Sequence, residues 1–286
     1  MNILTFDIEE WFHILDHSST KTEKQWNNFE YRLEHNIEKI FTLLDKHDQK
    51  ATFFCLGWVA KKFPGIIKKI DALGYEIGTH SNSHQLIYEQ SRTEYKEDLD
   101  ISLKRLGNIT GKKIRIYRAP GFSLRKEESW VFELLIEKGI EIDCSIFPAK
   151  RAHGGFEEFG YDGPARIQCK SGEIKEFPIN LYHIMKKNII FSGGGYFRLL
   201  PYFIINYMMN KSHYVMTYFH PRDFDKEQPI LQDLSYIRKF KSYYGLDSSL
   251  QKLDKLLKYH HFVDISTAEQ QIKWEDTKIV DIINKL

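Results

Sequence analysis

The sequence predicts an α/β protein in which helices cover a parallel sheet, and three observations support this. Short apolar runs alternate with stretches of helical periodicity along the first half of the 286-residue chain. Gly74 and Gly139 each follow an expected helix, at the position where a left-handed glycine commonly ends one. Unusual polar residues follow several of the apolar runs. We therefore expect about seven strands in a sheet that is either open or closed.

The expected elements alternate regularly up to Ser145 and then become irregular. Strands are expected at 3–6, 51–56, 75–78, 114–117 and 140–145, and helices at 31–44, 59–73, 93–106 and 127–138. After Phe147-Pro148, residues 149–197 are expected to form an irregular insertion with short β-like pieces such as 173–179. Two further β runs are expected at 214–219 and 262–265.

The sequence contains no low-complexity linker, internal repeat or sharp change of composition. We therefore expect a single α/β domain over residues 1–286, with a helical extension from about residue 230.

Composition and charge exclude several classes of protein. The chain has 41 Lys and Arg against 39 Asp and Glu, so it lacks the basic excess of a nucleic-acid binder. Its 42% hydrophobic content is that of a globular protein. Cys55, Cys144 and Cys169 cannot all form pairs, which indicates a reducing compartment. The N-terminus has no basic segment before an apolar run, so we expect a cytoplasmic protein without a cleaved signal peptide.

The longest apolar segment runs over residues 199–209 and is too short for the roughly 20 residues that span a bilayer. Pro201 and Asn206 interrupt it. We favour a buried helix that Pro201 opens. The alternative is peripheral contact with a membrane or with a lipid-linked substrate, which would make the protein membrane-associated.

Polar residues gather at the ends of the expected strands, where those of a parallel β/α arrangement converge. Each cluster alone has an ordinary explanation, such as a helix cap, a turn, an ion pair or a buried histidine. Together they contain two histidines with a carboxylate, which can form a three-ligand catalytic metal site. A further acid and histidine could then act as base and acid. The clusters are Asp7-Ile8-Glu9-Glu10, His80-Ser81-Asn82-Ser83-His84, Arg118-Ala119-Pro120-Gly121, Asp143 and His220-Pro221.

These clusters occur in the order of the motifs of a known family. They resemble the polysaccharide deacetylases, the family with the NodB homology domain (carbohydrate esterase family 4), over roughly residues 1–221. The motifs that carry the resemblance are Thr5-Phe6-Asp7-Ile8-Glu9, His80-Ser81-Asn82-Ser83-His84, Arg118-Ala119-Pro120-Gly121, Asp143-Cys144-Ser145 and Tyr218-Phe219-His220-Pro221. Residues 6–13, 192–201 and 220–225 further resemble the bacterial subgroup associated with exopolysaccharide and surface-glycan assembly.

The resemblance implies a distorted, incomplete (β/α) barrel, a divalent metal and removal of an acetyl group from an N-acetylated sugar. Zinc is the expected metal, with Co²⁺, Ni²⁺ or Mn²⁺ as alternatives. By the same resemblance Glu9, His80 and His84 bind the metal. Aspartate is usual at the position of Glu9, and Glu10 competes for the role.

Further roles follow from the resemblance. Asp7 is the general base and Arg118 pairs with it. His220 is the general acid, and Asp143 orients it. A backbone N–H near Gly121 is a candidate to stabilise the oxyanion.

The substrate-binding candidates surround these positions. Aromatic residues make up 14% of the chain, and those in loops could stack on sugar rings or meet a lipid carrier. Gly193-Gly194-Gly195 lacks the Lys-Ser/Thr of a nucleotide-binding loop, so we expect close approach of a sugar or headgroup instead. The candidates are Trp11, His13, Pro120, Gly121, Phe122 and Tyr196.

The sequence favours a metal-dependent N-deacetylase that acts on a polysaccharide or a lipid-linked surface-glycan precursor. Two alternatives stay open: an amidase or deformylase that hydrolyses another C–N bond with the same metal, and a catalytically inactive glycan-binding protein. Metal analysis would separate the enzyme readings from the binder.

Overall fold

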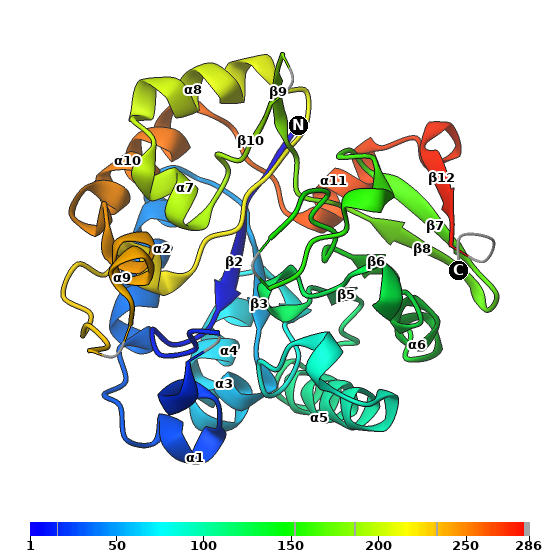
Figure 1. Ribbon diagram of the computed structural model, residues 1–286, viewed down its shortest axis with the longest axis horizontal. Coiled ribbons are helices and arrows are strands. Elements are labelled where there is room, and N and C mark those ends of the chain that lie inside the picture. The colour runs from blue at the N-terminus through cyan, green and yellow to red at the C-terminus, as the bar shows by residue number, and fades with distance from the viewer. Residues whose placement is uncertain (16, 152, 186, 233, 283–286) are drawn as a thin grey trace. The chain divides into compact units, whose positions relative to one another are not determined.

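The computed structural model describes residues 1–15, 17–151, 153–185, 187–232 and 234–282. The chain forms two compact units, each assembled from two segments (Figure 1). Unit 1 comprises Met1–Ala51 and Tyr182–Asp264, and unit 2 comprises Thr52–Leu181 and Ile265–Leu286. The single domain expected over residues 1–286 remains a prediction.

Unit 2 contains a mostly parallel sheet with strands in the order β12-β7-β8-β6-β5-β4-β3. Every neighbouring pair in this order is parallel except β7 and β8, which form an antiparallel hairpin. Within the unit the order runs from one side to the other without returning, so the sheet is open. The strands are β3 (Thr52–Cys55), β4 (Glu76–Thr79), β5 (Ile116–Tyr117), β6 (Ile142–Asp143), β7 (Ala165–Cys169), β8 (Gly172–Glu176) and β12 (Lys278–Asp281).

Helices cover this sheet and supply its core. Figure 1 shows α3, α4 and α5 side by side below the strands. Leu99 of α5 and Leu135 of α6 belong to one buried cluster with Tyr117, Ile167 and Ile174 of the sheet. The helices are α3 (Gly57–Lys62), α4 (Pro64–Ala72), α5 (Arg92–Thr110), α6 (Val131–Glu137) and α11 (Ile265–Gln271).

The helix expected over residues 59–73 is two helices. α3 ends at Lys62 and α4 begins at Pro64, with Phe63 between them. Proline has no N–H to donate to the preceding turn and is favoured at the first position of a helix. It therefore starts a new helix. The predicted end near Gly74 is confirmed, because Gly74 has φ +77° just after α4.

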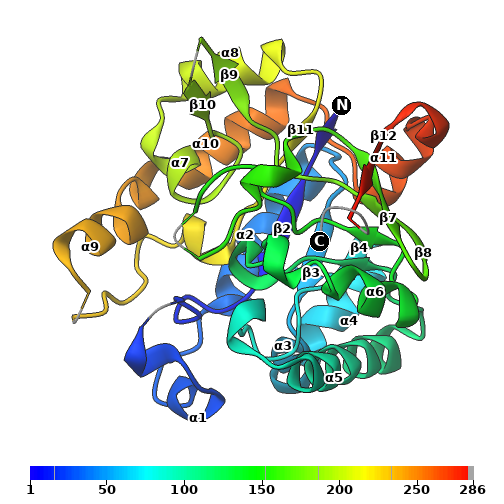
Figure 2. The same ribbon diagram turned by 45° about the vertical axis from the view of Figure 1, so that its right-hand side comes forward.

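In unit 1 the first two strands pair with the segment around residues 215–219. β1 pairs with β11 in parallel, and Phe6 of β2 forms a bridge with Phe219. Helices α2 and α10 contact each other within this unit (Figure 2). The elements are β1 (Asn2–Ile3), β2 (Thr5–Ile8), α1 (Glu23–Trp26), α2 (Leu33–Lys46), β9 (Tyr182–Ile184), β10 (Lys187–Ile189), α7 (Gly194–Leu199), α8 (Tyr202–Lys211), β11 (Val215–Met216), α9 (Tyr236–Tyr243) and α10 (Leu246–Tyr259).

The segment 149–197 is more regular than expected. Its β7–β8 hairpin is part of the sheet of unit 2, because β8 pairs with β6. β9 and β10 form a second hairpin in unit 1. The β run expected at 214–219 is shorter than predicted, and the strand expected at 262–265 is reduced to an isolated bridge between Val263 and Ile3. β11 covers only Val215–Met216, and Ile265 begins α11.

The helix that Pro201 was expected to open is α8, and Pro201 is its N-cap residue. The expectation that this helix is buried is corrected, because Ile205, Met208 and Met209 are buried but Phe203 is 71% exposed. Within the described ranges, none of the helices combines the length and the apolar character needed to cross a membrane.

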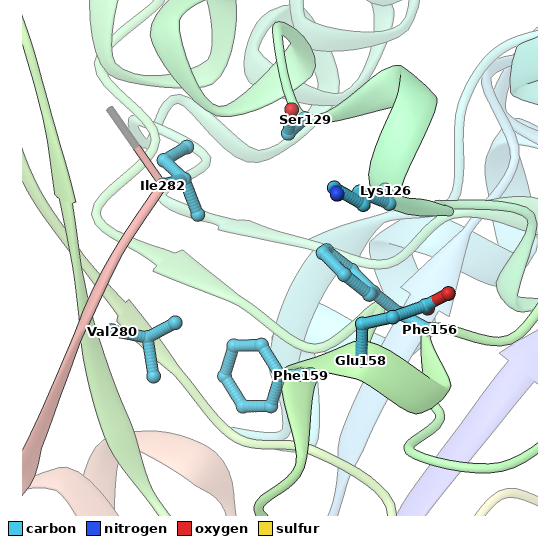
Figure 3. Close-up of a pocket in the computed structure, with 7 residues that line it drawn as sticks. All are labelled: Lys126, Ser129, Phe156, Glu158, Phe159, Val280 and Ile282. Carbon is cyan, nitrogen blue, oxygen red and sulfur yellow. The ribbon is translucent and has the colours of Figure 1, made fainter. Parts of the chain in front are cut away.

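Unit 2 also contains a small, half-open pocket of about 150 Å³ beside β12 (Figure 3). Apolar side chains of Phe156, Phe159, Val280 and Ile282 form most of its lining. No predicted site residue lines this pocket, so it is separate from the candidate chemistry.

Candidate active site

Unit 1 brings Asp7, Glu9 and His220 together. The backbone N–H of Asp7 donates to the carbonyl of Phe219 at 2.7 Å, which aligns β2 with the residue before His220. Nε2 of His220 lies 3.7 Å from Oδ2 of Asp7 and 3.6 Å from Oε1 of Glu9. Both acids are at least 95% buried. Three of the predicted site residues, from opposite ends of the chain, are therefore neighbours.

The other ring nitrogen of His220 is held by an acid that the sequence analysis missed. Oδ2 of Asp223 lies 3.0 Å from Nδ1 of His220 and also accepts the backbone N–H of His220 at 3.0 Å. Oδ1 of Asp223 lies 3.1 Å from Nε of Arg198, whose side chain is 5% exposed. The three-residue spacing from His220 to Asp223 is that of a capping box, which is the signal that could have revealed Asp223.

These neighbours keep His220 protonated at neutral pH. Burial alone lowers the pKa of His220, but the charges of Glu9, Asp223 and Asp7 outweigh it and raise the pKa to about 9. Burial raises the pKa of Asp223, while His220, Arg198 and Arg222 lower it to about 2. His220 is therefore a cation beside three carboxylates, the state required of a general acid.

Glu10, the competitor of Glu9, is bound to a helix. Its oxygens accept the backbone N–H groups of Arg32 and Leu33 at 2.9 and 3.0 Å and of Trp11 at 3.3 Å. These contacts satisfy donors at the start of α2. Burial raises the pKa of Glu10 to about 7 despite these hydrogen bonds. Glu9, rather than Glu10, is the acid beside His220.

In unit 2, His80 and His84 lie in a tight turn directly after β4. Ser81 and His84 have φ +70° and +55°, so the turn is not helical. The two imidazole rings are 5.5 Å apart and their residues are at least 94% buried. Nδ1 of His80 lies 2.8 Å from the carbonyl of Arg118, so Nδ1 carries the proton and Nε2 the lone pair. The pair has the chemistry and spacing of metal-binding histidines.

Asp98 of α5 holds this turn and was missed by the sequence analysis. Its carboxylate accepts the backbone N–H groups of Asn82 and Ser83 at 2.7 and 3.0 Å, and it also accepts the Ser83 hydroxyl. It is 9% exposed. Because Asp98 lies inside a helix 14 residues after His84, only the fold brings it to the turn.

Arg118 is fully buried in unit 2. Its guanidinium carbon lies 4.1 Å from the centre of the Phe54 ring, and Nε donates to the carbonyl of Cys144 at 3.3 Å. The pairing of Arg118 with Asp7 remains a prediction.

The structure corrects the prediction that Asp143 orients His220, because Asp223 binds Nδ1. Asp143 instead accepts the Ser145 hydroxyl at 2.6 Å and is in register with Glu176 on the neighbouring strand. Both acids are completely buried. Burial raises the pKa of Asp143, and burial together with the charge of Asp143 raises that of Glu176. Ionisation of both carboxyls at once is therefore unfavourable.

Most of the predicted substrate-binding residues are buried in the protein interior. Trp11 is 3% exposed and donates from Nε1 to the carbonyl of Glu30 at 2.9 Å. His13 and Phe122 are similarly buried, the former 4.3 Å from the Trp26 ring. Only Tyr196, at 46% exposure, presents a ring surface of the size that a sugar needs.

Pro120 and Gly121 begin a short 3₁₀ turn, in which Gly121 has φ +60°. Their contact with substrate remains a prediction.

The glycines at 193–195 have a structural purpose. A Cβ at Gly193 would come within 2.1 Å of the carbonyl of Tyr218, with which Gly193 forms a β-bridge. The close approach expected here is thus made by the chain itself.

Comparison with known proteins finds relatives for two parts of the chain, the first of which includes the motifs at His80–His84 and Arg118–Gly121. Residues 17–132 match the model of the polysaccharide deacetylase family, and residues 144–270 match a domain of unknown function, DUF3473. A peptidoglycan-N-acetylglucosamine deacetylase of Bacillus cereus is 35% identical over 96 residues, which are 33% of this chain and 35% of that protein. A chitooligosaccharide deacetylase of Azorhizobium caulinodans is 32% identical over 79 residues, 27% of this chain and 38% of that one. The matches thus span little more than a third of these relatives.

Two solved structures share the fold. A Mycobacterium smegmatis protein described as a polysaccharide deacetylase superposes with a TM-score of 0.65 at 16% identity, covering 97% of this chain and 91% of its own. PuuE allantoinase superposes with a TM-score of 0.61 at 13% identity, covering 94% and 88%. The predicted α/β fold of the NodB type is confirmed. Residues 17–132 are therefore similar to the polysaccharide deacetylase family, and the whole chain shares its fold with the two solved structures.

Proposed function

We propose that this protein hydrolyses the N-acetyl group of an N-acetylated sugar and releases acetate. The observation that carries the proposal is the setting of His220, with Nε2 beside Asp7 and Glu9 and Nδ1 bound to Asp223. A protonated imidazole next to buried carboxylates provides an acid and a base in one place. The named activities of the Bacillus and Azorhizobium relatives are of the same chemical type.

The proposed roles follow from these positions. Asp7 accepts a proton from the attacking water, whose oxygen forms a bond to the acetyl carbon. His220 donates its Nε2 proton to the sugar nitrogen as the C–N bond breaks, which yields acetate and an amine. Asp223 and Arg198 keep the ring oriented and charged for this donation.

The ligand proposal is that His80 and His84 of unit 2 and Glu9 of unit 1 hold a divalent metal, with Zn²⁺ favoured over Co²⁺, Ni²⁺ or Mn²⁺. The two imidazoles, 5.5 Å apart, fit this role. Such an ion would polarise the amide carbonyl and lower the pKa of a water molecule toward neutrality.

The proposed substrate is an N-acetylated sugar of an exopolysaccharide or surface glycan, either polymeric or lipid-linked. We place the enzyme in the cytoplasm, in contact with a membrane near residues 199–209. Three free, buried cysteines suit a reducing compartment.

The test is acetate release by the zinc-loaded protein from N-acetylglucosamine oligomers and, separately, from a lipid-linked N-acetylated sugar. Asp7→Asn should lower the rate by about 10²–10⁴-fold, the usual contribution of a general base. Asp45→Asn, at an exposed acid of the same unit, should leave the rate unchanged. Absence of acetate from both substrates, or full activity of Asp7→Asn, would contradict the proposal.

A further inference from the structure

One surface of unit 1 exposes large apolar side chains from two adjacent elements. On the β9–β10 hairpin, Ile184 and Met185 are 42% and 99% exposed. On α8, Phe203 and Tyr207 are 71% and 55% exposed. We call these four residues the α8–hairpin surface. Apolar side chains grouped on a protein surface commonly mark a contact with another molecule or with a membrane.

The hairpin and the helix form a continuous structure. The rings of Tyr182 on β9 and Tyr207 on α8 have centroids 6.3 Å apart. Both views show the hairpin beside α8 (Figures 1 and 2). Phe203 and Tyr207 are one helical turn apart, while Ile205, Met208 and Met209 are buried. The helix thus has apolar residues on its outer side as well as its inner side.

The backbone at the tip of the hairpin adds a second observation. Met185 has φ +51°, the left-handed region in which a residue with a Cβ costs about 1–2 kcal/mol. Glycine or asparagine is the usual choice at such a turn position. The sequence instead has a methionine whose side chain is almost fully exposed. The exposed side chain buries almost no surface within the fold and is therefore available for an external contact.

The charge of this region is one-sided. Residues 177–222 contain no Asp or Glu, and they include Lys187 and Lys211 next to the α8–hairpin surface. Both lysines are exposed, and among the described residues neither forms an ion pair with a carboxylate. The surface therefore combines apolar tips with uncompensated positive charge.

We propose that the α8–hairpin surface docks on a bilayer that contains anionic lipids. Met185 and Phe203 would enter the boundary between headgroups and acyl chains, Tyr207 would lie at the headgroups, and the lysines would meet lipid phosphates. A second copy of this chain fits less well, because the same positive charges would face each other. Docking is independent of catalysis, but its use, access to a lipid-linked sugar, rests on the proposed function.

The experiment is co-sedimentation of the full chain with vesicles of phosphatidylcholine, with and without phosphatidylglycerol. The unaltered protein should bind the anionic vesicles. Met185→Ser combined with Phe203→Ser should weaken binding about tenfold or more, because each substitution removes an apolar side chain that docking would bury in the bilayer. Lys187→Glu and Lys211→Glu should each weaken binding to anionic vesicles about fivefold. Leu73→Ser, a 50% exposed leucine of unit 2, is the matched control and should bind normally.

Three results would overturn the proposal: no binding of the unaltered protein to anionic vesicles, equal loss in the Leu73→Ser control, or a dimer in solution that the Met185→Ser and Phe203→Ser changes abolish. Acetate release from a soluble oligomer should be the same in the double variant and the unaltered protein. A failure of docking would therefore be distinguishable from a failure of the deacetylase activity.

Discussion

Nδ1 of His220 lies 3.0 Å from Oδ2 of Asp223, and the opposite oxygen of Asp223 lies 3.1 Å from Nε of Arg198. These contacts orient the ring of His220, the proposed general acid, through its Nδ1 atom and leave Nε2 facing Asp7 and Glu9. Arg198 is fixed in turn, because its terminal nitrogens donate to the carbonyls of Lys241, Ser242 and Tyr244. The geometry makes Asp223 and Arg198 positioning residues for His220.

Asp223→Asn should reduce kcat for acetate release by about 10²–10⁴-fold, the range assigned to general acid catalysis. The amide carries no charge to stabilise the imidazolium, so the pKa of His220 should also fall below about 9. The pH dependence of kcat and an NMR titration of the ring measure the two effects. Asp45→Asn is the control, and an unchanged pH profile in Asp223→Asn would refute the assignment.

The metal-free protein should lose stability in alkaline solution because of His220. Its pKa rises from 6.5 unfolded to about 9 folded, so its stabilisation is complete below pH 6.5 and disappears as the pH rises through 9. The contribution is at most about 3 kcal/mol. Urea unfolding of the unaltered protein and of His220→Asn should differ at pH 6 and converge above pH 10. A constant difference across this range would count against the raised pKa.

Substitution of Glu9 should change zinc binding, whereas substitution of Glu10 should change stability. Glu10→Ala leaves backbone donors at the start of α2 without an acceptor and should lower the free energy of unfolding by about 1–3 kcal/mol, with normal zinc content. Glu10→Gln keeps an acceptor and should cost less. Glu9→Ala should instead reduce bound zinc. Elemental analysis and urea unfolding provide both readouts, and the reverse pattern would make Glu10 the ligand.

Loss of either histidine of the turn should remove the metal. His80→Ala and His84→Ala should each lower zinc affinity strongly and abolish acetate release, because a three-ligand site loses a donor. His220→Ala should keep the metal while losing activity. His261→Ala, at an exposed histidine, is the control. Zinc retained in His80→Ala at the level of the control would contradict the ligand assignment.

Glu176→Gln should stabilise the protein at alkaline pH. The pKa values of Asp143 and Glu176 are raised on folding, so stability falls as the pH rises above their unfolded values and the carboxyls ionise. A neutral Gln removes this repulsion and still offers an acceptor to the backbone N–H of Ile146. The gain should be about 1–3 kcal/mol at pH 9 and smaller at pH 5. Glu173→Gln on the same strand is the control, and equal changes in stability in both variants would argue against the raised pKa of Glu176.

The sequence alone determined the repeating pattern of strands and helices in residues 1–145, because apolar periodicity and helix-ending glycines are local signals. It also marked Asp7, Glu9, His80, His84 and His220 as candidate site residues, since a reactive side chain at the end of a strand stands out from its neighbours. Local signals were less reliable where one proline decided the outcome, as at Pro64.

Only the tertiary structure decided which partner holds each of these groups. Asp223, and not Asp143, contacts Nδ1 of His220, and Glu10 accepts backbone N–H groups at the start of α2. Asp98 reached the histidine turn from the interior of a helix. A hydrogen bond depends on where distant segments meet and on which donors burial leaves unsatisfied. Residue types and spacing can therefore indicate the chemistry of a site, whereas the contacts that orient and charge it emerge only when the chain is folded.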